Sequence, residues 1–86
     1  MGADIPPQQH PEAIGCKVKR LRTEKRLSQD RLALGAHVDQ SGLSKFERGG
    51  KGIGRTALTR IAAVLEVSFE DLVSGTDFLE PTSMDR

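Results

Sequence analysis

The stretch 27–49, LSQDRLALGAHVDQSGLSKFERG, decides the fold because it contains two helix start signals close together. Ser28 and Asp39 are good N-cap residues, whose side-chain oxygens accept hydrogen bonds from the backbone N–H groups of the next turn. Apolar residues follow each cap at helical spacing, and Gly49 is a natural terminator. The stretch therefore predicts two short helices, 29–36 and 40–48, joined by a turn.

Each of these helices has one apolar face. The inward-facing residues are expected to be Leu32, Ala33 and Ala36 in the first helix, and Leu43 and Phe46 in the second. The second helix then turns polar side chains outward, among them Gln40, Ser41 and Lys45, with Ser44 near the edge of that face. A helix of about two turns is marginal alone, so packing against other helices must hold both.

The flanking sequence predicts three more helices. An apolar stripe with i, i+4 and i+7 spacing predicts one over 12–25, and a similar stripe predicts another over 55–65, after a glycine-rich loop. Ser68 caps a last short helix that Gly75 closes. The fold class is therefore expected to be all-α, with five helices. The predicted organisation is a flexible N-terminal arm at 1–11, a domain at 12–75 and an acidic C-terminal tail at 76–86.

Composition supports a small helical protein. The 86 residues include three phenylalanines, no tryptophan and no tyrosine, and they suffice for one small core. The single cysteine, Cys16, cannot form an internal disulfide and is expected to be a buried or half-buried small hydrophobe. Neither a signal peptide nor a membrane-spanning run is apparent, so we expect a cytoplasmic protein with no membrane partner.

The net charge of +1 hides a gradient along the chain. Residues 17–31 carry seven basic side chains against two acidic ones, and 45–60 carry five against one. Residues 66–86 carry six acids and one arginine. The body is therefore basic, which suits a nucleic-acid partner, although solvated helix faces would give the same pattern.

Two capped helices around the turn Ala36-His37-Val38 make a helix-turn-helix unit, and the residues around it are more specific. From about Ile14 to Gly75 the chain resembles the lambda-repressor-like (Xre, phage repressor and Cro) helix-turn-helix family. The matching residues are Leu27-Ser28-Gln29, Leu32-Ala33, Ser44, Glu47-Arg48-Gly49, Val67-Ser68 and Asp71-Leu72. The departures are His37 and Glu66, which stand where the family commonly has glycine, and Gly42, which replaces a bulky residue.

The resemblance implies a bacterial or phage-type, nucleoid-associated transcriptional regulator, with repression as the expected effect. It would bind double-stranded DNA sequence-specifically as a homodimer, with helix 40–48 in the major groove. The residues implied to read bases are Gln40, Ser41, Ser44 and Lys45. Those implied to contact phosphates are Ser28, Gln29, Arg48, Lys51 and Arg55. Arg22 and Glu47 correspond to a structural ion pair that orients the reading helix.

Other functions fit the sequence less well. The chain shows no catalytic constellation, metal site or cofactor motif, since Cys16, His10 and His37 are isolated and the 49–54 loop lacks a phosphate-loop pattern. The alternative is an antitoxin or accessory protein-interaction module on the same scaffold, with the tail as a protein-binding segment. The expected dimer surface is made of Val64, Val67, Val73 and the Phe78-Leu79 pair.

Overall fold

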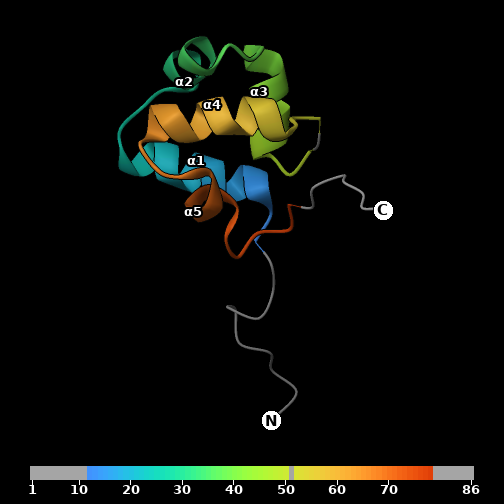
Figure 1. Ribbon diagram of the computed structural model, residues 1–86. Coiled ribbons are helices and arrows are strands. Elements are labelled where there is room, and N and C mark those ends of the chain that lie inside the picture. The colour runs from blue at the N-terminus through green and yellow to red at the C-terminus, as the bar shows by residue number, and fades with distance from the viewer. Residues whose placement is uncertain (1–11, 51, 79–86) are drawn as a thin grey trace, which may run out of the picture.

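Five helices follow one another in the computed structural model, which describes residues 12–50 and 52–78 (Figure 1). They are α1 (Ile14–Glu24), α2 (Gln29–Ala36), α3 (Gln40–Glu47), α4 (Arg55–Leu65) and α5 (Phe69–Val73). The described part of the chain contains no strand beyond one isolated parallel bridge between Glu12 and Thr76. The predicted all-α, five-helix fold is confirmed.

The observed helix boundaries agree closely with those predicted from the sequence, because local signals set most of them. The predictions for α2 and α4 match both of their ends. Helix α3 ends one residue early because Arg48 leaves helical geometry before Gly49, which has φ +99°. Helix α1 begins at Ile14 because Glu12, predicted to be helical, pairs with Thr76 in extended backbone instead.

All three predicted N-caps form. The Ser28 hydroxyl accepts from the Arg31 backbone N–H at 3.0 Å, the Asp39 carboxylate from Gly42 at 3.0 Å, and the Ser68 hydroxyl from Asp71 at 2.9 Å. Two helices end on a non-glycine residue in left-handed conformation. These are His37 after α2, with φ +58°, and Glu66 after α4, with φ +63°. Both are positions where glycine would fit without strain.

Each helix of the domain packs mainly against two others, and α4 joins α2 to α5. Helix α4 packs against α2 on one side and α5 on the other, while α1 packs against α3 and α5 (Figure 1). The buried apolar core consists of Ile14, Val18, Leu32, Ala33, Ala36, Leu43, Phe46, Leu58, Ile61, Ala62, Leu65 and Leu72. Every helix contributes to this core, so α2 and α3 are held by tertiary packing, as their short length requires.

The burial of Cys16 was predicted wrongly, because its side chain is exposed. The residue is two positions from both Ile14 and Val18, whose side chains are the buried apolar ones of α1. Two positions correspond to a rotation of about 200° around a helix, which turns the thiol away from the core.

Candidate nucleic-acid interface

One face of α3 is exposed and polar. Gln40, Ser41 and Lys45 are exposed, while Leu43 and Phe46 on the opposite side are fully buried. The sequence produces this division because an apolar pair three residues apart fixes which side of a short helix meets the core. Three of the four residues predicted to read bases therefore lie on one open surface, and the fourth, Ser44, lies at its edge.

The edge of this face contains a polar pair. The Nη1 atom of Arg48 donates a hydrogen bond to the Oγ atom of Ser44 at 2.8 Å, across one turn. Ser44 is half-buried and Arg48 is exposed. The Ser44 hydroxyl keeps a hydrogen that it can donate, so this pair could meet a polar group that lies along the side of α3.

A shallow recess of about 300 Å³ flanks the exposed face of α3. Its walls are formed by Asp39, Ser41, Gly42 and Lys45 on one side and by Gly52 and Ile53 of the following loop on the other. Gly42, which stands where the resembled family has a bulky residue, lines this recess and has no side chain to fill it. The recess therefore gives a partner close access to the α3 backbone.

A buried ion pair holds the far end of α3. Arg22 donates from Nε and Nη2 to the two carboxylate oxygens of Glu47, at 2.8 and 2.9 Å. The Glu47 side chain is only 1% exposed and that of Arg22 13%. Glu47 is the last residue of α3, where the helix dipole disfavours a carboxylate, so the pairing from α1 is needed to compensate it.

Two further contacts join this pair to α2. The third Arg22 nitrogen, Nη1, donates to the carbonyl oxygen of Leu27 at 2.8 Å. The amide of Gln29 donates to Glu47 Oε1 at 2.9 Å. The single Glu47 carboxylate therefore ties α1, α2 and α3 together. The sequence and the resemblance indicated the Arg22–Glu47 pair but gave no sign of the Gln29 contact.

The start of α2 keeps some capacity for a ligand. Gln29 is half-buried and uses one amide N–H on Glu47, which leaves a second N–H and the carbonyl oxygen. The Ser28 hydroxyl accepts from the α2 backbone and keeps its own hydrogen as a donor. Both side chains lie at a helix N-terminus, where backbone N–H groups favour an anion.

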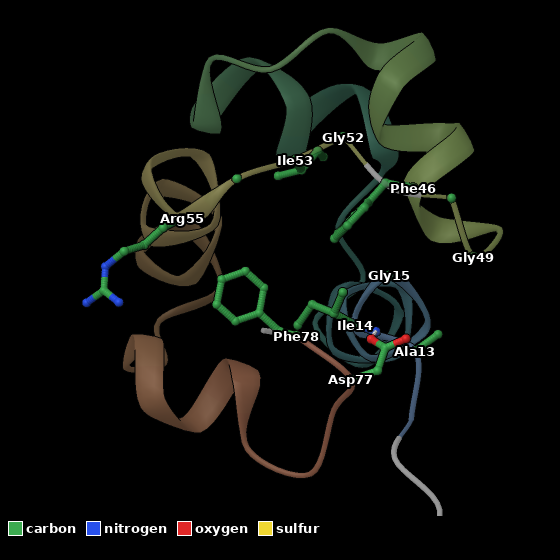
Figure 2. Close-up of a pocket in the computed structure, with 12 residues that line it drawn as sticks. Ala13, Ile14, Gly15, Phe46, Gly49, Gly52, Ile53, Arg55, Asp77 and Phe78 are labelled. Carbon is green, nitrogen blue, oxygen red and sulfur yellow. Dashed lines mark hydrogen bonds between the residues drawn. The ribbon is translucent and has the colours of Figure 1, made fainter. Parts of the chain in front are cut away.

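The structure does not bring Arg55 to this surface. Its guanidinium lies 4.3 Å from the centre of the Phe69 ring, at the start of α5, and Figure 2 shows it pointing away from α3. Lys51, the other predicted phosphate contact of this loop, lies outside the described residues.

A larger, mainly apolar pocket of about 430 Å³ lies under the loop that follows α3 (Figure 2). Its apolar walls come from Ile14, Phe46, Ile53 and Phe78. No sequence signal predicted it, because it forms only where the segment after α5 returns to α1. Among the described residues, no cluster of metal-binding side chains is found, and no helix is long and apolar enough to cross a membrane.

Comparisons with known proteins agree with this arrangement. A family model described as Helix-turn-helix matches residues 18–72. RghR of Bacillus subtilis (strain 168), an HTH-type transcriptional repressor, is 29% identical over 70 residues, which are 80% of this chain and 52% of RghR. The chain thus spans about half the length of that relative.

Solved structures give the same result. SinR of Bacillus subtilis, the master regulator for biofilm formation, was crystallised in complex with DNA. That structure is 37% identical, with a TM-score of 0.66, and the match covers 71% of this chain and 98% of the SinR chain in the crystal. The restriction-modification controller C.AhdI of Aeromonas hydrophila is 30% identical with a TM-score of 0.66, covering 70% and 91% of the two chains. The chain therefore belongs to the lambda-repressor-like (Xre) helix-turn-helix family of DNA-binding transcriptional regulators.

Proposed function

We propose that this protein binds a specific duplex DNA site as a homodimer, reads the major groove with α3 and thereby represses transcription. The observation that carries the proposal is the exposed polar face of α3, with Gln40, Ser41 and Lys45 in the open. The same helix is anchored by the buried side chains of Leu43 and Phe46. The contacts of Glu47 with Arg22 and Gln29 hold its last turn. A reading helix needs this combination, because base recognition depends on side chains held in fixed positions.

The exposed side chains have the chemistry of base recognition. Lys45 donates and suits the O6 and N7 acceptors of guanine, whereas the amide of Gln40 both donates and accepts and suits adenine. Ser41 and Ser44 can take either role. A good bidentate contact contributes about 1–3 kcal/mol of discrimination against the wrong base. In this proposal, Lys45 and Gln40 supply most of the base choice.

Other residues would set the register on the phosphate backbone. Ser28 and Gln29 stand at the start of α2, where side-chain donors combine with free backbone N–H groups. Arg48 stands at the end of α3, and Lys51 follows in sequence. We leave Arg55 out of the proposed interface because its guanidinium stacks on Phe69.

Homodimerisation would place two reading helices about 34 Å apart on one face of the DNA, which doubles the length of the site. Val64, Val67, Val73 and Phe78 are half-buried and pack against the core, which leaves part of each side chain for a partner. Leu34 on α2 is 78% exposed and offers a further apolar surface for dimerisation. Leu79, which also belongs to the expected dimer surface, lies outside the described residues. A monomer in sedimentation at tens of micromolar, without DNA, would contradict this part of the proposal.

A selection from random duplexes, followed by a salt titration on the winning site, tests the function. We expect a two-fold symmetric site and a steep fall in affinity with salt. Lys45→Ala should weaken the best site most and relax base choice, whereas Lys51→Ala should weaken all sequences alike. Lys19→Ala, an exposed residue of α1, removes the same charge and is the control.

Two results would overturn the proposal. If the selection enriches no duplex, sequence-specific binding is wrong. If Lys45→Ala weakens every sequence equally, α3 does not read bases through this side chain.

A further inference from the structure

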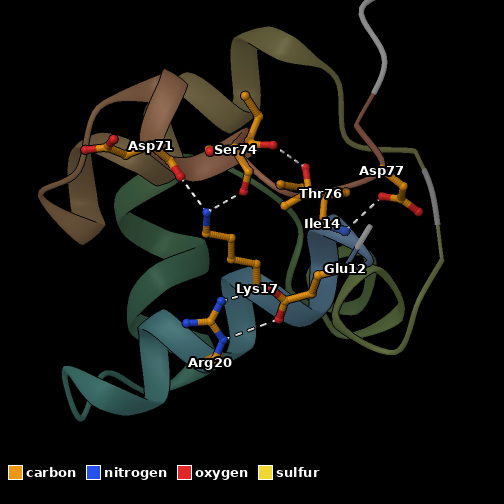
Figure 3. Close-up of polar contacts among 9 residues, drawn as sticks. Glu12, Ile14, Lys17, Arg20, Asp71, Ser74, Thr76 and Asp77 are labelled. Carbon is orange, nitrogen blue, oxygen red and sulfur yellow. Dashed lines mark hydrogen bonds and ion pairs between the residues drawn. The ribbon is translucent and has the colours of Figure 1, made fainter. Parts of the chain in front are cut away.

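The segment after α5 returns to the start of α1 and is bonded to it (Figure 3). The Glu12 N–H donates to the Gly75 carbonyl oxygen at 2.9 Å, and the Asp77 N–H donates to the Glu12 carbonyl oxygen at 2.9 Å. These two bonds make the parallel bridge between Glu12 and Thr76. We call residues 75–78 the C-terminal strap.

Asp77, although far from α1 in the sequence, caps the N-terminus of this helix. The N-cap position of α1 is Ala13, whose side chain cannot accept a hydrogen bond, and the first turn contains no acidic residue. The carboxylate of Asp77 accepts from the Ile14 backbone N–H at 3.0 Å instead. It thus supplies both the missing acceptor and the negative charge that a helix N-terminus favours.

The first turn of α1 also touches the end of the reading helix. A Cβ atom on Gly15 would overlap the carbonyl oxygen of Phe46 and lie 3.2 Å from the Cα atom of Glu47. The two backbones are therefore in direct contact, with no side chain between them. Since packed backbones cannot yield independently, the position of the α1 first turn bears directly on the last turn of α3.

Phe78 makes a second connection between the strap and this region. Its ring lines the pocket beside Ile14, Phe46 and Ile53, beneath the loop that follows α3 (Figure 2). It also meets the Phe69 ring edge to face, with centroids 5.7 Å apart. The strap therefore supports both the end of α3 and the loop that leaves it.

Contacts that do not involve the strap hold α5 against α1. The Lys17 ammonium donates to the carbonyl oxygens of Asp71 and Ser74, at 2.6 and 2.8 Å, and holds the end of α5 on α1 (Figure 3). Gly75, with φ +74°, follows at the point where the chain changes direction. Asp77 itself is exposed, and three hydrogen bonds join the strap to the start of α1, between Glu12 and Gly75, Glu12 and Asp77, and Ile14 and Asp77. Segments attached at the surface in this way are those that open locally.

We infer that Asp77 and Phe78 are positioning residues for the reading helix, so that release of the C-terminal strap from α1 lowers DNA affinity. This inference rests on the proposed function of α3 as the reading helix. Asp77 and Phe78 would not touch DNA themselves and would affect its binding only through α3. A protein partner that binds the C-terminal strap and withdraws Asp77 from α1 would loosen the end of α3 and weaken DNA binding.

Amide NMR on the full chain tests the coupling without DNA. Asp77→Ala should speed hydrogen exchange at Ile14 by about fivefold, the equivalent of one lost N-cap. It should also shift the resonances of Gly49 and Gly50, whose N–H groups donate to Phe46 and Lys45 at the end of α3. Asp77→Asn, which keeps an acceptor, should restore most of both effects. Glu70→Ala removes an exposed charge from α5 and is the control.

DNA binding by the same variants gives the second readout. The binding is measured at protein concentrations that keep the dimer intact, because Phe78 also belongs to the expected dimer surface. Asp77→Ala and Phe78→Ala should then each weaken the selected site by about two- to fivefold, the loss expected when the stabilisation of one helix cap is removed. The base preference should stay unchanged, because α3 still carries the reading side chains. Phe78→Leu, which keeps an apolar side chain in the pocket, should lose less.

The outcomes separate the two proposals. If Asp77→Ala alters only the α1 amides and leaves Gly49 and Gly50 unchanged, the coupling is wrong. If the native protein binds its site and both strap variants bind it equally well, the inference is also wrong. If Gly49 and Gly50 shift but no duplex binds the native protein, the coupling stands and the proposed function fails.

Discussion

Arg22 and Glu47, 25 residues apart, form a two-pronged ion pair in which the carboxylate is almost completely buried. We expect Arg22→Ala to lower the free energy of unfolding by about 3–5 kcal/mol, because it leaves the Glu47 charge buried without its main partner. Urea denaturation would measure this loss. The double variant Arg22→Met, Glu47→Leu should recover much of the stability. A double variant as unstable as the single one would contradict this account.

Replacement by alanine should affect different properties at Gln29 and Gln40: stability at the first and base preference at the second. Gln29→Ala removes a hydrogen bond to the buried Glu47 carboxylate and should cost about 1–2 kcal/mol of stability, somewhat less than a fully buried bond to a charge. Gln40→Ala alters an exposed side chain and should leave stability within about 0.5 kcal/mol while changing base preference. Thermal unfolding compares the two. Equal losses of stability would show that the Glu47 contact contributes nothing.

Gly15 and Gly42 are both helical, but a methyl group has opposite consequences at the two sites. Gly15→Ala should destabilise the protein by several kcal/mol, because the new Cβ collides with the Phe46 backbone. Gly42→Ala meets Asp39 at an ordinary 3.9 Å and should stabilise α3 by about 0.5–1 kcal/mol. Chemical denaturation of the two single variants is sufficient. A tolerated Gly15→Ala would mean that α1 and α3 can move apart.

Two of the three left-handed non-glycine residues, His37 and Glu66, are helix C-caps and offer a way to stabilise the fold. Glycine at either position should add about 0.5–1 kcal/mol, since relief of the left-handed strain exceeds the entropy that glycine adds to the unfolded chain. Ala63→Gly, at an exposed position inside α4, should instead cost about 1 kcal/mol. Melting temperatures should therefore move in opposite directions. A loss of stability in His37→Gly would point to a contact of the imidazole ring in the folded protein.

Features set by near neighbours in the sequence could be predicted. The caps at Ser28, Asp39 and Ser68 each act on a backbone group three residues away, so the sequence shows both partners at once. The exposed face of α3 followed from the spacing of Leu43 and Phe46. The prediction that Cys16 is buried was wrong because it did not take into account the rotation around α1 that separates Cys16 from Ile14 and Val18.

Features that join distant parts of the chain could not be predicted. The cap on α1 comes from Asp77, 63 residues beyond Ile14, and no local pattern marks it. The stacking of Arg55 on Phe69 and the edge-to-face contact of Phe69 with Phe78 likewise depend on how α4, α5 and the strap come together. Gln29, which is expected to contact a phosphate, also donates its amide to Glu47, and this second contact requires α2 and α3 to be packed first.

The bridge between Glu12 and Thr76 has a practical consequence for protein engineering. Because the entry and exit of the described domain lie beside each other, a short linker between them could close the chain for circular permutation, with new ends opened at the exposed loop after α3. The same proximity means that the domain could be inserted as a cassette into a surface loop of another protein, with both junctions leaving from one point.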